Sequence, residues 1–137
     1  MLSVADIADP VFRAALEEAD HLLDEGDYAG ASRKCAETYL LLLEQHPELI
    51  PPQSGPSGFY QLKPPEAQGE GTLNQYAAAR ATRVGFWPTT GSIQVIVGED
   101  RKPTLVYTKD RFSFSEASSY YEYLINQLWR LQKQAQD

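Results

Sequence analysis

The chain has 137 residues, the usual length of one domain, and its 42% hydrophobic content is enough to bury a core without disulfides or metals. Its formal net charge of −7 argues against binding to a nucleic-acid backbone, because no stripe of basic residues offsets the acidic ones. Cys35 is the only cysteine, which excludes an intrachain disulfide.

The first residues carry neither the basic region nor the long apolar region of a secretory signal. The longest aliphatic run, Leu40 to Leu43, is far too short to cross a bilayer. We therefore expect a cytoplasmic protein that does not associate with a membrane.

The first helix is expected to lie between Pro10 and Gly26. Asp9 can cap it, and Pro10 suits the first helical position, because an N–H at that position would have no partner within the helix. Gly26 is expected to end the helix, because glycine tolerates the left-handed conformation of a C-terminal cap. Apolar residues at spacings of three and four form one stripe: Phe12, Ala15, Leu16, Ala19, Leu22 and Leu23.

The second helix is expected to begin after Asp27, a suitable N-cap, and to end before Pro47. Leu40 and Leu41 spread apolar surface almost all round its end, which is typical of a helix buried on several sides. We therefore predict that Tyr39, Leu40 and Leu41 bind a protein partner. The apolar stripe of this helix comprises Tyr28, Ala31, Cys35, Tyr39, Leu42 and Leu43.

Residues 26–31, with the sequence GDYAGA, resemble the turn and second-helix start of a tetratricopeptide repeat. Ala19 and Ala31 match the small residues that this family places where its helices touch, and Pro47 resembles its closing proline, about one turn late. The resemblance covers residues 12–47 in one copy, whereas repeat solenoids generally contain three or more. It implies a helical hairpin and binding to protein.

Residues 48–72 are rich in proline and glycine and are expected to form a long loop. Phe59, Tyr60 and Leu62 form a small apolar island within it. This island either pins the loop to the core of the domain or offers an extended segment to a partner. Phe59 and Tyr60 are therefore candidate partner-binding residues.

Residues 73–83 favour a short helix, after which the apolar period changes. Ile93, Val95 and Val97 alternate as in a strand, and residues 105–108 are expected to form the return strand after a polar turn at 98–103. A two-stranded hairpin is marginal in water, so a third strand is expected near residues 84–87 or 111–114.

A long C-terminal helix is predicted after Ser113, which has capping-box spacing to Glu116. Its seam packs either on the rest of the domain or on a second copy of the chain, as a homodimer. Tyr121 and Leu128 are therefore candidate partner-binding residues. The seam has heptad-like spacing and comprises Ala117, Tyr121, Leu124, Leu128, Leu131 and Ala135, with Tyr120, Ile125 and Trp129 beside it.

Glu18 and His21 have the Glu-x-x-His spacing that di-iron helical bundles use for metal ligands. Such bundles need two copies, and the second histidine, His46, lies at the wrong spacing from Glu44. The chain also lacks a nucleophile elbow and a phosphate loop. We therefore predict no metal site, no cofactor and no catalytic residue, and an enzyme is the less favoured class.

Aromatic residues gather in the C-terminal half of the chain. Stacking on single-stranded nucleic acid would also need a positive groove, which the charge argues against. Most of these residues are expected in the core. A flat apolar ligand held between sheet and helix is the alternative, with Trp87, Tyr107 and Phe112 as candidate ligand-binding residues.

Together these patterns predict one α+β domain. It comprises a helical hairpin (1–47), a proline- and glycine-rich loop (48–72) and a C-terminal part (73–137) with a short helix, a small antiparallel hairpin or sheet, and a long helix.

The favoured function is non-catalytic protein–protein interaction, as a small adaptor or assembly partner. The alternative is a small-molecule-binding module or an enzyme built on the C-terminal aromatics. Residues 1–50 hold eleven acidic and three basic residues. They therefore also suggest an antitoxin-like acidic protein that binds a basic partner through residues 17–27.

Overall fold

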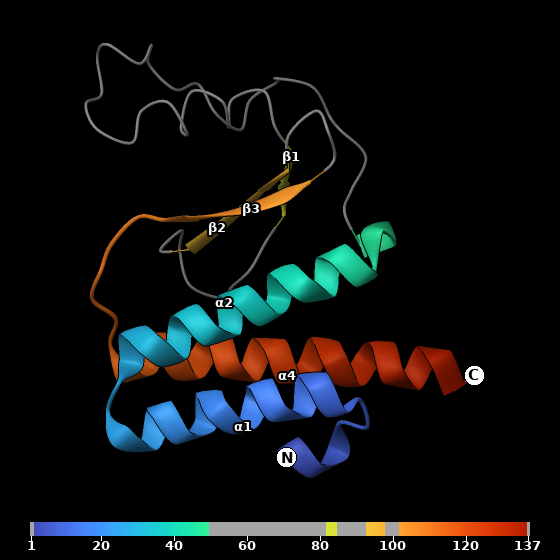
Figure 1. Cartoon of the computed structure of the whole chain (residues 1–137), viewed down its shortest axis with the longest axis horizontal. Coiled ribbons are helices and arrows are strands. Elements are labelled where there is room, and N and C mark those ends of the chain that lie inside the picture. The colour runs from blue at the N-terminus through green and yellow to red at the C-terminus, as the bar shows by residue number, and fades with distance from the viewer. Residues whose placement is uncertain (1, 50–81, 85–92, 98–101, 137) are drawn as a thin grey trace. The chain divides into compact units, whose positions relative to one another are not determined.

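The computed structural model describes residues 2–49, 82–84, 93–97 and 102–136 (Figure 1). Most of these residues are helical. The chain divides into two compact units. The helical unit consists of the described residues within Met1–Tyr39, Phe86–Ile93 and Tyr107–Asp137, and the second unit of those within Leu40–Gly85 and Gln94–Val106.

Helix α1 (Pro10–Glu25) begins and ends as the sequence predicts. The Asp9 carboxylate accepts hydrogen bonds from the backbone N–H groups of Val11 and Phe12, at 2.9 and 3.3 Å, and so satisfies two donors that have no partner within the helix. Gly26 follows with a φ of 83°, in the left-handed region that glycine adopts without steric cost. The centre of the predicted stripe is buried, at Phe12, Leu16 and Ala19.

Helix α2 (Tyr28–Gln45) runs antiparallel to α1 over the part that belongs to the helical unit (Figure 1). The Asp27 carboxylate caps its start by accepting a hydrogen bond from the Gly30 N–H at 2.9 Å, as predicted. Ala19 on α1 and Ala31 on α2 are both buried, at 1% and 0% exposure. The two helices therefore form the expected antiparallel pair, while its kinship with tetratricopeptide repeats stays a prediction.

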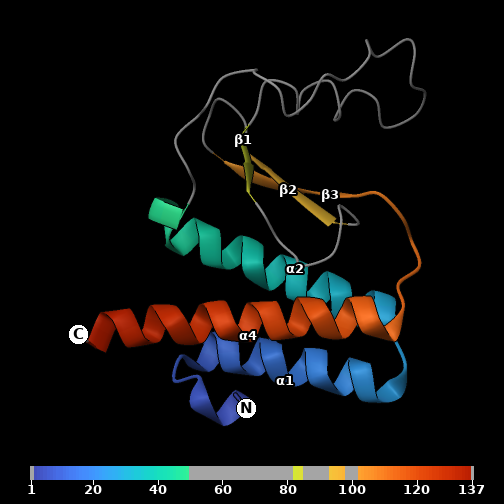
Figure 2. The same ribbon diagram turned by 180° about the vertical axis from the view of Figure 1, so that it is seen from behind.

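Helix α4 (Phe114–Gln136) starts with the predicted capping box. The Ser113 hydroxyl accepts a hydrogen bond from the Glu116 N–H, and the Glu116 carboxylate accepts one from the Ser113 N–H, each at 3.1 Å. Helix α4 packs on α1 in the opposite direction and runs parallel to the helical-unit part of α2 (Figures 1 and 2). Its buried residues are Ala117, Tyr120, Leu124, Ile125 and Leu128.

This buried face differs in detail from the predicted heptad-like seam. Tyr120 is fully buried, whereas Tyr121 is half-buried and Ala135 is exposed. A helix that packs inside a globular unit buries a wide stripe with a period of 3.6 residues, and not the narrow 3.5-residue seam of a coiled coil. The sequence therefore indicated the helix correctly but assigned one of its two adjacent tyrosines to the wrong place.

One side chain holds the residues before α1 to the last part of α4. The short 3-10 helix η1 (Val4–Asp6) contacts α1. The side-chain oxygen of Gln132 accepts a hydrogen bond from the Ala8 N–H at 2.7 Å, and its amide nitrogen donates to the Asp6 carbonyl at 2.8 Å. Between these two bonds lies Ile7, which is 1% exposed. Ile7 therefore belongs to the helical core, while the other described residues before α1 lie on its surface.

The second unit contains the end of α2, the 3-10 helix η2 (Pro47–Leu49) and most of a three-stranded sheet. Two residues at strand ends, Ile93 and Tyr107, belong to the helical unit instead. The strands are β1 (Thr82–Val84), β2 (Ile93–Val97) and β3 (Pro103–Tyr107), in the order β1-β2-β3. Strand β1 pairs antiparallel with β2. The predicted strand at residues 93–97 is confirmed with the same bounds.

Two expectations for this region need correction. The helix predicted over residues 73–83 is wrong at its end, because Thr82 and Arg83 form a strand; residues 73–81 lie outside the described residues. β-branched residues such as Thr82 and Val84 favour a pleated strand. Of the third strand expected near residues 84–87, Val84 lies in β1 and residues 85–87 lie outside the described residues; the alternative at 111–114 is wrong because α4 begins at Phe114.

The return strand also begins earlier than predicted, at Pro103 and not at Leu105. Proline is tolerated as the first residue of a strand, where its missing N–H breaks no ladder bond. Of the long loop predicted at 48–72, only Glu48 and Leu49 are described, and both belong to η2.

Candidate functional site

The predicted partner-binding residues fall into three groups. Tyr39 and Leu128 are buried, at 5% and 6% exposure. The side chains of Leu40, Leu41 and Tyr121 are half-buried. Phe59 and Tyr60 lie outside the described residues. A partner that docks on the folded chain would reach the second group more readily than the first, and the binding role of all seven residues stays a prediction.

Tyr39 is held by another aromatic residue of the helical unit. Its ring meets that of Tyr123 edge to face, with the ring centroids 6.0 Å apart. Burial raises the pKa of the Tyr39 hydroxyl, and the charge and side-chain hydrogen bond of Tyr123 raise it further. The phenol therefore stays protonated and acts as a structural hydrogen-bonding group.

Tyr121 of α4 is half-buried in the helical unit. Burial, with smaller contributions from Asp20 and Cys35, raises the pKa of its hydroxyl to about 12. It therefore stays a neutral phenol that packs among the helices.

Cys35 is a buried structural thiol. It is 0% exposed, and burial raises the pKa of its thiol to about 12. We expect a thiol reagent such as 5,5′-dithiobis(2-nitrobenzoate) to leave the folded protein unlabelled at pH 8 and to label one thiol in concentrated urea. Fast labelling of the folded protein would show instead that Cys35 is reachable and reactive.

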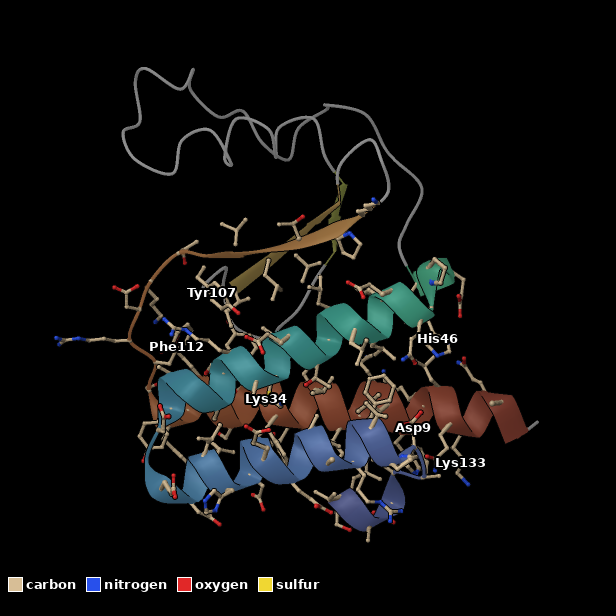
Figure 3. The ribbon with its side chains drawn as sticks, in the orientation of Figure 1. Asp9, Lys34, His46, Tyr107, Phe112 and Lys133 are labelled. Atoms are coloured by element: carbon tan, nitrogen blue, oxygen red, sulfur yellow. The ribbon has the colours of Figure 1, made fainter. Side chains whose placement is uncertain are left out.

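Two of the predicted ligand-binding aromatics, Tyr107 and Phe112 (labelled in Figure 3), have different neighbours. The guanidinium of Arg33 lies 5.7 Å from the centroid of the Tyr107 ring, which is 36% exposed. Phe112 is 8% exposed and packs edge-on against Tyr120, with their centroids 6.4 Å apart. Trp87 lies outside the described residues. Its burial and its contact with Tyr120 indicate that Phe112 is a core residue, and the small-molecule hypothesis stays a prediction.

Both histidines are exposed or half-exposed and bond to a neighbouring carboxylate. His21 Nε2 lies 2.9 Å from Glu25 Oε1, and His46 Nδ1 lies 2.9 Å from Glu48 Oε1. His21 thus contacts Glu25 and not Glu18, the partner in its Glu-x-x-His spacing; Glu18 instead lies 3.1 Å from the Lys34 ammonium. Within the described ranges, no three His, Cys, Asp or Glu residues gather as metal ligands.

Sequence reasoning missed an exposed aromatic pair, here called the aromatic patch, formed by Tyr28 and Phe114. Phe114 is 58% exposed and Tyr28 is half-buried. Their rings meet edge to face with centroids 5.6 Å apart and an interplanar angle of 68°. The sequence did contain one signal for Phe114, because a residue directly after an N-cap stands on the open first turn of its helix.

The aromatic patch lies where α1 ends and where both α2 and α4 begin (Figures 1 and 2). Tyr28 is the first residue of α2, and Phe114 is the first residue of α4. Exposed carboxylates stand in the last turn of α1, at Asp24 and Glu25, and in the turn that joins α1 to α2, at Asp27. This arrangement presents two aromatic rings within an acidic surrounding.

Comparison of the chain with protein-family models, with curated proteins and with solved structures finds no match. Within the described ranges, none of the helices has the length and apolar character needed to span a bilayer.

Proposed function

We propose that this chain is a non-catalytic protein–protein interaction module, a small adaptor or assembly partner that docks its partner on the aromatic patch. The observation that carries this proposal is the 58% exposure of Phe114 in contact with Tyr28. Large aromatic side chains that lose water on binding supply much of the energy of many protein interfaces. An exposed aromatic pair is therefore a suitable anchor.

The position of the patch on two capped helix starts supports the same function. Tyr28 follows the N-cap Asp27, and Phe114 follows the N-cap Ser113, so both rings stand on capped helix starts. Little backbone conformational entropy would therefore be lost when a partner covers them.

The proposal includes the α+β class and a tetratricopeptide-like hairpin. The antiparallel direction of α1 and α2, the left-handed Gly26 between them and the burial of Ala19 and Ala31 support that hairpin. Such a hairpin would serve as the frame that positions the aromatic patch.

A matched pair of variants tests the proposed function. Phe114 and Val11 are both 58% exposed and both stand in the first turn of a helix, but only Phe114 belongs to the patch. We expect Phe114→Ala to weaken binding to a partner captured by cross-linking in the native host by about tenfold or more, because truncation of an aromatic anchor costs that much. Val11→Ala should leave that binding unchanged.

The affinity of each variant for the purified partner can be measured by calorimetry, and light scattering shows whether the partner is a second copy of the chain. Equal binding by wild type, Phe114→Ala and Val11→Ala would contradict a docking role for the aromatic patch.

A further inference from the structure

We propose that the segment docked on the aromatic patch is basic, with arginine or lysine side chains over the two rings. This inference rests on the proposed function and names the chemistry of its partner. It starts from the surroundings of Tyr28 and Phe114 in the helical unit. Aromatic faces attract cations through their ring quadrupole, so these two rings can receive a cation as well as an apolar group.

The formal charges of the side chains around the rings favour the cation, whereas the two helix starts that carry the rings contribute partial positive charge. Residues 24–28 and 109–116 contain five carboxylates and two cations, a net charge of −3. One of the cations, Lys109, pairs with Glu116, and Arg111 is the other. The exposed carboxylates of Asp24 and Glu25 stand in the last turn of α1, next to the turn that leads into Tyr28. Acidic groups around an aromatic centre complement a positive segment and repel an acidic one.

A protein segment fits this surface better than the other occupants. The same carboxylates would repel the phosphates of a nucleic acid. A second copy of the chain would bring the same acidic residues to a symmetric contact, because a two-fold interface places identical patches together. A basic segment of another protein avoids both penalties.

The test uses the full chain labelled with ¹⁵N and a short synthetic peptide in which arginines alternate with serine and glycine. A peptide of equal length with glutamine in place of arginine serves as its control. We expect the arginine peptide to shift the amide signals of residues 24–28 and 109–116, with an affinity that falls as salt rises. The glutamine peptide should shift none of them.

Two double variants distinguish the effect of the carboxylates near the patch from the effect of the net charge of the whole chain. Asp24→Asn with Glu25→Gln removes two carboxylates beside the patch, and Glu44→Gln with Glu48→Gln removes two exposed carboxylates from the end of α2 and from η2. The two double variants are matched, because each removes two charges and breaks one contact between a glutamate and a histidine: Glu25 with His21 in the first, Glu48 with His46 in the second. We expect the first pair to weaken peptide binding about fivefold or more, and the second to change it less than twofold.

Each result bears on one claim. Equal weakening by the two double variants, or amide shifts away from the patch, would overturn the basic-segment proposal, because attraction would then follow net charge alone. If Phe114→Ala weakens binding of the natural partner but Asp24→Asn with Glu25→Gln does not, this inference is wrong and the proposed function still holds. If the partner binds Phe114→Ala as tightly as it binds the wild type, the proposed function itself is wrong.

Discussion

Replacement of Leu128 by aspartate should destabilise the helical unit by about 4 kcal/mol, because it buries a carboxylate without a partner. Leu128 is 6% exposed on the packed face of α4. Urea denaturation followed by circular dichroism measures the loss, and Leu128→Met should cost less than about 1.5 kcal/mol because it conserves volume. Ser115→Asp adds the same charge at an exposed position of the same helix and should change stability little.

This substitution also separates two roles for α4. If Leu128 packs within its own chain, as its burial indicates, the aspartate variant unfolds more easily. A folded variant of unchanged stability that light scattering shows as a monomer, next to a dimeric wild type, would instead place Leu128 in a homodimer interface.

Replacement of Leu16 by alanine should lower the free energy of unfolding by about 3 kcal/mol, because it leaves a cavity in the face of α1 that packs in the helical unit. Leu16 is 0% exposed. Val11→Ala on the same helix removes two methyl groups from a side chain that is 58% exposed and should cost less than about 0.5 kcal/mol. The two unfolding curves, measured in urea, give the comparison directly, and equal costs would contradict the burial of Leu16.

Local chemistry explains which parts of this fold could be predicted from the sequence. The caps at Asp9, Asp27 and Ser113 and the left-handed Gly26 each depend on residues no more than a few positions apart. A sequence contains all the partners of such a motif, so the helix starts and the turn were predicted correctly.

The errors concern features that depend on distant residues. Whether Thr82 and Arg83 join a strand is decided by their pairing with Val97 and Ile96, which no local pattern reports. Which of Tyr120 and Tyr121 is buried depends on the neighbours of α4.

The aromatic patch was missed for a similar reason. It joins Tyr28 to Phe114, residues that are far apart in the sequence and meet only because α2 and α4 begin at the same end of the helical unit. Each ring lies in a segment predicted to be helical, but the pairing of the two rings follows from how those helices pack.

The double hydrogen bond of Gln132 has a consequence for how the molecule opens. Because one amide group holds the backbone on either side of Ile7, fraying of the last turns of α4 releases the first residues as well. The two ends of the chain should therefore exchange their amide hydrogens with solvent as one cooperative unit, although they are separated by almost the whole sequence.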